Sequence, residues 1–220
     1  MKLSAFATAL VLAWASTISG SPTGSIEARQ VVSPPPGFAI TKQTVNGSGC
    51  PPGSTFYVLN GDKSAVTVGF SRYYAEVGPN IPISSNRRNC QLTWSVNVPP
   101  GFSFGLAAVD YRGWYQLDDK VTASQQSSYY FQGHLAQATA RSELVGPVAG
   151  RDYLYQDQFD LVSTVLSPCG TSTVLNIQTD LRTNNSKNPR GYGYIATDSV
   201  CPHSSFSSWP FTDVIPIEII

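Results

Sequence analysis

The sequence predicts an all-β protein, folded as a single antiparallel β-sandwich or jelly-roll that is held by disulfides. Two observations indicate this class: hydrophobic and polar residues alternate in several short segments, and Gly- and Pro-rich turns separate those segments. A third is that no long stretch shows the 3.6-residue period of an amphipathic helix. The 220 residues suit one large β domain, and a 41% hydrophobic content is enough for a core.

The clearest strand signal is the segment 91–98, where hydrophobic residues occupy every second position (Leu92, Trp94, Val96 and Val98). Because a shift by one residue would turn all of them to water, this pattern fixes the register of the strand. A turn at 99–101 follows, and the alternation continues over 102–108. It breaks at 109–113, where polar and aromatic residues crowd together and Gly113 would permit a positive φ.

Other segments predict further strands. They are 55–59 and 65–71, joined by the hairpin dipeptide Asn60-Gly61, then 121–124, 127–132, 136–141, 151–155, 161–166, 174–182 and 194–197. The alanine-rich segment 136–141 also fits a short helix, but Gly146-Pro147 after it and the strands around it favour a strand. Residues 30–49 are interpreted as a loosely ordered strap and 73–89 as a long connection.

The N-terminus has the pattern of a secretory signal peptide, predicted as residues 1–20. Lys2 is the positive start, an apolar run follows, and small residues precede the cleavage region. The apolar run is shorter than the ~20 residues that a bilayer span needs. Residues 21–30 are expected to be a short pro-segment or disordered N-terminus, with Arg29 as a processing site. The sandwich is predicted over 31–199, and the protein is expected outside the cell.

Charge and cysteines narrow the class of protein. Fourteen basic and fourteen acidic residues cancel, so no basic face for nucleic acid or an anionic membrane is expected. An even number of cysteines behind a signal peptide favours disulfides over a metal site. Three pairings are possible, and the favoured one joins Cys50 to Cys90 and Cys169 to Cys201. Asn46 and Asn184 begin glycosylation sequons and are expected on surface loops.

Two segments carry combinations of motifs: 89–133 contains NCQL, VDYRG and YYFQG, and 167–199 contains SPCG, LNIQTDLR, NSKNP and GYIATDS. Together they resemble the secreted, mainly fungal proteins grouped as domain of unknown function 4360, over about residues 49–199. The resemblance implies a secreted, disulfide-bonded β fold and a family without an established activity.

Residues 200–220 depart from the pattern of that family and are predicted to be an atypical tail. A valine codon begins with GT, the bases of a splice donor, which raises the hypothesis that the tail is translated intron. In that case Cys201 is not the last cysteine of the family pattern, and Cys169 lacks its natural partner.

No catalytic residue, metal site or cofactor is predicted. His134 and His203 are the two histidines, and no serine lies in a GxSxG context. Asp118 and Asp119 would point to opposite faces of a strand. With Asp110 they could supply oxygen ligands for Ca²⁺, yet the spacing of a calcium loop is absent. Turn formation is the simpler interpretation of these aspartates.

The best candidate binding surface is the segment 110–115, which contributes Asp110, Tyr111, Arg112, Trp114 and Tyr115. Aromatic rings can pack on the apolar face of a sugar ring, and charged groups can hydrogen-bond its hydroxyls. Tyr129 and Tyr130 would extend this surface if the strands pair. The structural alternative is that Arg112 stacks on Trp114 and pairs with Asp110 to hold a corner.

The sequence therefore favours a non-enzymatic, secreted protein that binds at the cell wall or another extracellular surface. The expected partner is a polysaccharide or an extracellular protein, without nucleic acid and without a membrane span. The alternative is a polysaccharide-active hydrolase or lyase on a jelly-roll, with Asp110 and Tyr111 or a second carboxylate as acid and base.

Overall fold

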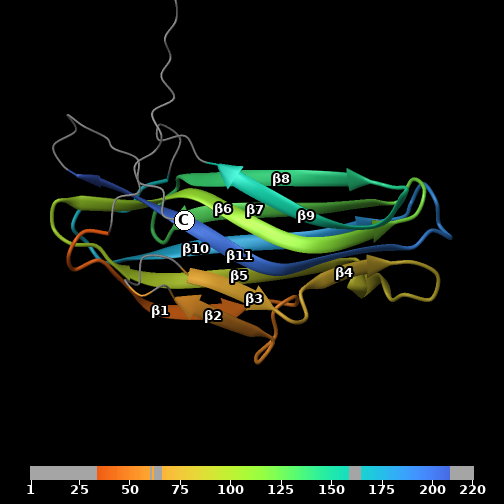
Figure 1. Cartoon of the computed structure of the whole chain (residues 1–220), viewed down its shortest axis with the longest axis horizontal. Helices are drawn as coiled ribbons and strands as arrows, with labels where there is room; N and C mark the ends of the chain where they lie inside the picture. The colour runs from red at the N-terminus through yellow and green to blue at the C-terminus, as the bar shows by residue number, and fades with distance from the viewer. Residues whose placement is uncertain (1–33, 60, 62–65, 159–164, 209–220) are drawn as a thin grey trace, which may run out of the picture.

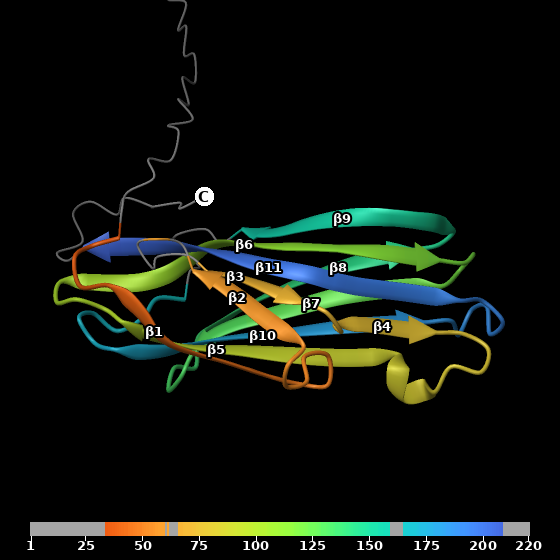
Figure 2. The same cartoon turned by 60° about the horizontal axis from the view of Figure 1, so that its bottom comes forward.

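The computed structural model describes residues 34–59, 61, 66–158 and 165–208. These residues form two antiparallel sheets packed face to face, which Figures 1 and 2 show as two elongated layers. The predicted all-β sandwich is therefore confirmed. The predicted signal peptide, the segment 21–30, most of the predicted strand 161–166 and residues 209–220 of the tail lie outside the described residues.

Both sheets contain strands from distant parts of the chain. The five-stranded sheet A has the order β1 (Ala39–Asn46), β5 (Arg87–Asn97), β10 (Thr173–Asn184), β7 (Thr122–Phe131) and β8 (Gln137–Val145). The six-stranded sheet B has the order β2 (Thr55–Leu59), β3 (Val66–Phe70), β11 (Gly193–Ser208), β6 (Phe102–Leu117) and β9 (Val148–Gln158). Strand β4 (Tyr74–Val77) also pairs with β11, and the 3₁₀ turn η1 (Ile83–Ser85) precedes β5.

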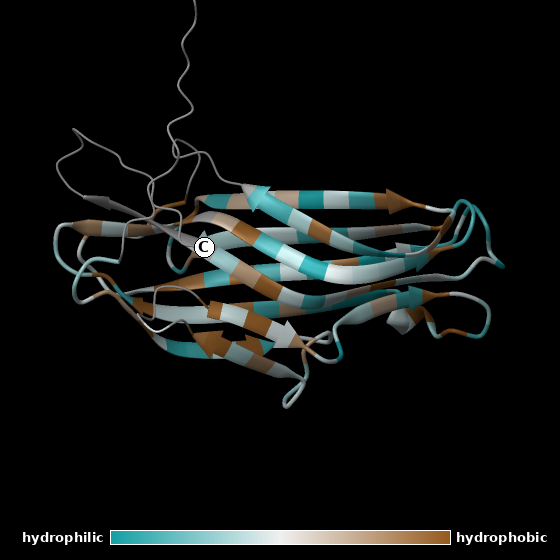
Figure 3. Ribbon diagram, in the orientation of Figure 1, coloured by the Kyte–Doolittle hydropathy of each residue, from teal (hydrophilic) through white to brown (hydrophobic). Residues whose placement is uncertain are grey.

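Alternation of hydrophobic and polar residues decides which side of each strand faces the other sheet. In β5, alternate side chains from Cys90 to Val96 are buried, and the polar ones between them lie on the outer face. Strand β7 follows the same period over its whole length. Figure 3 shows the result as alternating hydrophilic and hydrophobic bands along the strands. Burying one large apolar side chain contributes roughly 1.5–3 kcal/mol, so this pattern specifies the sandwich.

The core lies between the two sheets and combines aliphatic residues with tyrosines. Its largest fully buried side chains are Tyr73, Tyr111, Phe104, Phe131, Leu92, Leu117, Leu175, Ile177, Leu181, Ile195, Val66 and Val68. Phe104 and Phe131 meet edge to face, with ring centroids 6.0 Å apart. Buried residues of both sheets therefore belong to one hydrophobic cluster.

Two segments predicted as irregular contain strands. Within the predicted strap, β1 pairs with β5 through a β-bulge between Ile40 and Lys42. Within the predicted long connection, β4 pairs with the first residues of β11. Both are edge or short strands, and they carry few large hydrophobic residues, so the alternation that reveals the other strands is weak there.

The alternation of 102–108 does break at this point, because the neighbours Ala108 and Val109 are both buried and the inward side changes from even to odd positions. The strand itself does not end there, since β6 continues through 109–113. Gly113 is needed for space rather than for a positive φ. A Cβ at this position would lie 1.9 Å from the carbonyl oxygen of Ala196 and 2.7 Å from the ring of Tyr153. The missing side chain lets Tyr153 pack against the strand and place its hydroxyl 2.7 Å from the Thr197 hydroxyl.

Strand β11 is longer than the predicted segment 194–197. It pairs with β6 from Gly193 opposite Leu117 to Ser208 opposite Phe102. The domain boundary predicted at Ser199 therefore falls inside a strand. That residues 200–220 are translated intron stays a hypothesis.

The predicted disulfide between Cys50 and Cys90 is confirmed, with Cα atoms 5.5 Å apart and both residues buried. Cys90 belongs to β5 of sheet A, and Cys50 lies between β1 of sheet A and β2 of sheet B. The bond therefore fastens the chain to the core at the point where it crosses from one sheet to the other.

The predicted disulfide between Cys169 and Cys201 is absent, since both residues are free thiols. The register explains this correction. Cys201 lies opposite Asp110 of β6, while the amide of Gly170 donates to the carbonyl of Phe102 at 2.8 Å, near the other end of that strand. The eight residue steps from Phe102 to Asp110 span about 26 Å. A disulfide requires Cα atoms within about 7 Å.

Removing the Cys50–Cys90 bond is expected to destabilise the fold. It closes a loop with a sequence separation of 40 residues, and the chain-entropy argument gives a loss of about 3–4 kcal/mol. Urea unfolding of the Cys50→Ala, Cys90→Ala double variant measures this loss. The Cys169→Ala variant, which removes an exposed free thiol, is the control and should unfold at the native midpoint. If the native protein and both variants unfold at the same urea concentration, the Cys50–Cys90 bond does not stabilise the fold.

Candidate functional site

The five predicted binding residues divide between the two sides of β6. Arg112 is exposed, and Asp110 and Trp114 are half-buried on the outer face of sheet B, whereas Tyr111 and Tyr115 are 0% and 6% exposed in the core. Successive side chains of a strand point to opposite faces, so adjacent residues cannot share one surface. The structure thus corrects the expected surface by removing both tyrosines. A binding role for Asp110, Arg112 and Trp114 stays a prediction.

Trp114 joins two tyrosines that come from other strands. Its ring centroid lies 5.7 Å from that of Tyr194 on β11, and Tyr194 stacks on Tyr74 of β4 at 5.5 Å. All three side chains are half-buried on the outer face of sheet B. We call Trp114, Tyr194 and Tyr74 the aromatic row, because they lie on three neighbouring strands, β6, β11 and β4.

The glycine at position 150 makes room for the indole ring. A Cβ there would lie 2.8 Å from Cζ2 of Trp114, and the positive φ of 130° also favours glycine. Strand β9 therefore gives the ring a surface to lie against on one side, while Tyr194 contacts it on the other. These two contacts hold Trp114 in place before any ligand arrives.

Charged residues surround a shallow pocket next to the aromatic row. The pocket has a volume of about 580 Å³ and is lined by Arg112, Gly113, Asp152, Tyr153, Leu154 and Asp198. Asp152 lies directly opposite Trp114 in the pairing of β6 with β9, which connects the pocket to the row. One cation and two carboxylates are thus available beside the rings.

Asp198 is exposed in this pocket, at a β-bulge. The pairing of β11 with β6 shifts between Thr197 and Ser199, which leaves Asp198 as the additional residue. Such a bulge changes the phase of the alternation, and Val200 after it is buried. Partial burial raises the pKa of the Asp198 carboxyl, and the nearby charge of Asp152 raises it further. The sequence gives no sign of this bulge, so Asp198 was not a predicted site residue.

The two core tyrosines have a structural role. The hydroxyls of Tyr111 and Tyr129 lie 2.8 Å apart, and the Tyr129 hydroxyl donates a short hydrogen bond to Asp157. Tyr111 therefore donates to Tyr129 in turn. Burial raises the pKa of both phenols, which keeps them protonated as donors. Tyr129 is thus a core residue, and Tyr130 lies half-buried on the outer face of sheet A, so neither extends the aromatic row.

The aspartates weighed for catalysis or calcium do not gather. Asp110 accepts a hydrogen bond from Gln156 at 2.8 Å, and Asp118 accepts one from the amide of Tyr192 at 2.7 Å. Among the described residues, no group of three or more His, Cys, Asp or Glu could hold a metal ion. Asp118 instead closes a turn, as the sequence suggested.

The two sequon asparagines are exposed, but they end strands instead of lying within loops. Asn46 is the last residue of β1 and Asn184 the last of β10, and both side chains lie on the outer face of sheet A. Their glycosylation stays a prediction. The described part of the chain has no helix long and apolar enough to cross a membrane.

These features define a two-layer antiparallel β-sandwich with an aromatic row on one outer face. Residues 36–207 match the family described as Domain of unknown function (DUF4360), and the chain belongs to this family. This confirms the resemblance found in the sequence. A relative from the fungus Arthroderma benhamiae, called an uncharacterized secreted protein, is 38% identical over 162 residues. These cover 73% of this chain and 65% of the relative, so the chain spans less than two thirds of its length.

Solved structures show only distant similarity. The carbohydrate-binding module TmCBM61, in complex with β-1,4-galactotriose, is 12% identical and covers 74% of this chain and 89% of its own, with a TM-score of 0.27. A family 11 carbohydrate-binding module from Clostridium thermocellum, in complex with a β-1,3-1,4-mixed-linked tetrasaccharide, is 7% identical. It covers 75% of this chain and 95% of its own, with a TM-score of 0.22. Similarity at this level carries no argument about what the present chain does.

The half-buried carboxyl of Asp157 is expected to make stability depend on pH. Burial raises its pKa, although hydrogen bonds from Tyr129 and Ser127 oppose the shift. A raised pKa means that the carboxyl keeps its proton to a higher pH in the folded state than in the unfolded state, where its pKa is about 3.9. The contribution of this group is therefore full below pH ~3.9 and is lost as the pH rises through the folded pKa.

Urea unfolding of the native protein and the Asp157→Asn variant at several pH values between 3.5 and 7 tests this direction of change in stability. The free energy of unfolding of the native protein, relative to the variant, should fall as the pH rises. The Asp119→Asn variant, at an exposed position, is the control and should follow the native curve. A constant difference between native protein and Asp157→Asn would show that Asp157 does not titrate differently in the folded state.

Proposed function

We propose that this protein is a secreted, non-enzymatic protein that binds a polysaccharide on the outer face of sheet B. The observation that carries the proposal is the aromatic row, held on three adjacent strands beside a charged pocket. Secretion is supported by the signal-peptide pattern of residues 1–20 and by the name of the fungal relative.

The chemistry of this face suits a sugar chain. One side of a pyranose ring presents C–H groups that pack on an aromatic ring, and its edge presents hydroxyls that need hydrogen-bond partners. Trp114 and Tyr194 supply the rings, while Arg112, Asp152 and Asp198 supply a donor and two acceptors. The row and the pocket lie on paired strands whose positions are fixed by the ladder, so little ordering is required when a ligand binds.

The proposed binding surface predicts which variants lose a ligand. In co-sedimentation with insoluble chitin, β-glucan and cellulose, the native protein should be depleted by at least one polymer. Trp114→Ala and Tyr194→Ala should each weaken that binding about 5- to 150-fold, because loss of a stacking ring costs about 1–3 kcal/mol by analogy with base stacking. Tyr130→Ala is the matched control, since it removes a half-buried tyrosine from the opposite outer face.

Two results would contradict the proposal. One is the absence of depletion by every polymer, and the other is an equal loss of binding in Trp114→Ala and Tyr130→Ala. Circular dichroism of each variant separates lost binding from lost fold. Retained binding by Trp114→Ala would remove the aromatic row from the ligand surface.

A second candidate function rests on the two carboxylates of the pocket. Glycoside hydrolases use one carboxyl that keeps its proton as the acid and a second, ionised one as base or nucleophile. The pKa of Asp198 is raised by partial burial and by Asp152, which is the direction an acid requires. Asp198 and Asp152 therefore replace Asp110 and Tyr111 in the enzymatic alternative, because Tyr111 is buried.

Release of reducing sugars from the bound polymer distinguishes the two functions. The binding protein should release none, at any pH from 4 to 7. If sugars are released, Asp198→Asn and Asp152→Asn should each abolish the activity while binding persists. Activity of that kind would replace the non-enzymatic proposal with a hydrolase, whereas release that survives both variants would exclude this pair as the catalytic groups.

A further inference from the structure

The outer face of sheet A differs in chemistry from the face that carries the aromatic row. Its central strands present amide, hydroxyl and charged side chains in cross-strand rows. The Asn176 side-chain oxygen, for example, accepts from Gln91 at 3.1 Å and from Thr93 at 2.9 Å. These hydrogen bonds join the side chains of β5 and β10 across the outer face.

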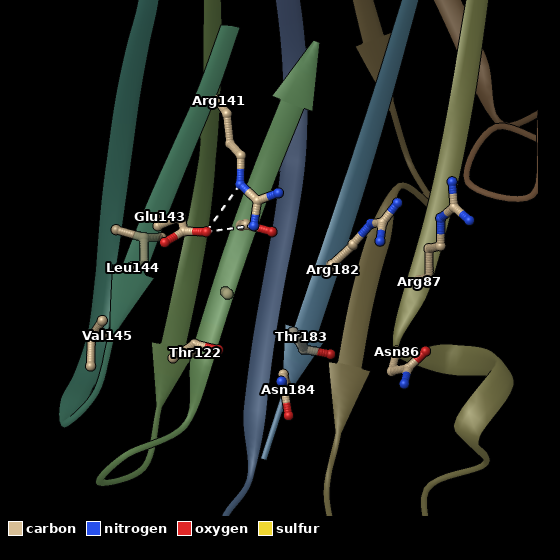
Figure 4. A pocket seen from close by; sticks show the side chains of 12 residues that line it. Asn86, Arg87, Thr122, Arg141, Glu143, Leu144, Val145, Arg182, Thr183 and Asn184 are labelled. Atoms are coloured by element: carbon tan, nitrogen blue, oxygen red, sulfur yellow. Dashed lines mark hydrogen bonds and ion pairs between the residues drawn. The ribbon is translucent and has the colours of Figure 1, made fainter. Parts of the chain in front are cut away.

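A groove of about 560 Å³ lies at one end of this face, beside η1. Figure 4 shows Arg141 and Glu143 on one side of the groove and Arg182 and Arg87 on the other. Thr122 and Ser124 of β7 lie between these walls, and Asn86 and Asn184 also line the groove. The groove therefore combines three guanidinium groups with hydroxyl and amide groups.

Two of the three arginines have a carboxylate partner. The Arg87 side chain donates to Asp180 through two nitrogens, each 2.8 Å from the same oxygen. Arg141 pairs with Glu143 on the same strand. The Arg182 guanidinium has no hydrogen bond or ion pair within the part of the chain that the structure describes, and its side chain is exposed. The groove thus has one positive charge that no carboxylate compensates.

The position of Arg182 costs stability. In the pairing of β10 with β5 it lies directly opposite Arg87, and like charges at opposed positions of a sheet repel. Its neighbour on the other side is Ser124, which is neutral. A planar guanidinium with five donors binds a carboxylate through two parallel hydrogen bonds, so an anion placed here would remove the repulsion.

We infer that this groove binds the carboxylate of a uronic acid within an acidic polysaccharide. Arg182 takes the carboxylate, and the polar groups of Thr122, Ser124 and Asn86 lie within the same groove for the sugar hydroxyls. A nucleic acid does not fit, because its phosphates need many basic groups and the chain is neutral overall. The site lies on the outer face opposite the aromatic row, and it does not depend on the function proposed for that row.

Polygalacturonate and its fully methyl-esterified form are matched probes, because they share one sugar chain and differ in the charge of the carboxyl. Affinity electrophoresis of the native, full-length protein should show retardation by the acid form and at least tenfold weaker binding of the ester. Added salt should weaken binding of the acid form, because screening reduces attraction at an exposed site. Equal binding of the acid and the ester would overturn the inference.

Arg182→Gln should reduce binding of polygalacturonate at least tenfold. The matched control is Arg151→Gln, which removes the same charge from an exposed position of β9 in sheet B. If both variants weaken binding equally, attraction is unspecific and the groove is not the site. Binding of inorganic phosphate as tight as that of a galacturonate oligomer would identify a general anion site and would overturn the uronate assignment.

Two further comparisons isolate the groove. Trp114→Ala should bind polygalacturonate like the native protein, and Arg182→Gln should bind neutral polymers like the native protein. Failure of the groove and failure of the aromatic row are then separate results. Asn184 begins a sequon at the end of the groove, so Ser186→Ala, which removes the sequon, is measured beside the native protein. Binding only in Ser186→Ala would overturn the inference for the natural protein.

Discussion

The pairing of β6 with β11 is the constraint on which the rest of the structure depends. It joins the longest strands of sheet B from Leu117 opposite Gly193 to Phe102 opposite Ser208. Each strand also pairs on its free side, β6 with β9 and β11 with β3 and β4. The register of this one ladder therefore decides which side chains of these two strands enter the core. With the pairings of β6 with β9 and of β11 with β4, it also brings together the aromatic row and both carboxylates of the pocket.

The close approach at Gly113 illustrates this dependence. No side chain fits between the glycine and the carbonyl of Ala196, and Tyr153 fills the space on the inner side. At the bulge next to it, β11 has one residue more than β6, and the inward side changes from odd to even positions. Asp198 is therefore exposed and Val200 is buried. A larger residue at position 113 would thus disturb the ladder, the core and the pocket together, because one short stretch serves all three.

The sequence predicts what depends on neighbouring residues and misses what depends on strand pairing. The hydrophobic residues of β5 and β10 alternate clearly in the sequence because the inner faces of these strands are buried. Continuing the alternation of 102–108 would place Tyr111 and Tyr115 outside, but it changes phase at Ala108 and Val109, and both tyrosines are buried. Tyr74 and Asp198 lie far from Trp114 in the sequence, and no local pattern in a single chain reveals such pairs or an unpaired bulge residue.

Exposure is the physical reason to favour binding over catalysis at the pocket. Arg112, Asp152 and Asp198 are all exposed, so water reaches each charged group and weakens its electrostatic effect on a reacting bond. A binding surface tolerates water, because hydrogen bonds to sugar hydroxyls can be direct or bridged. The raised pKa of Asp198 alone is the feature that a hydrolase would need. Aromatic rings that the sheet holds in place can stack on a sugar ring even on an open surface. The geometry therefore supports binding better than catalysis.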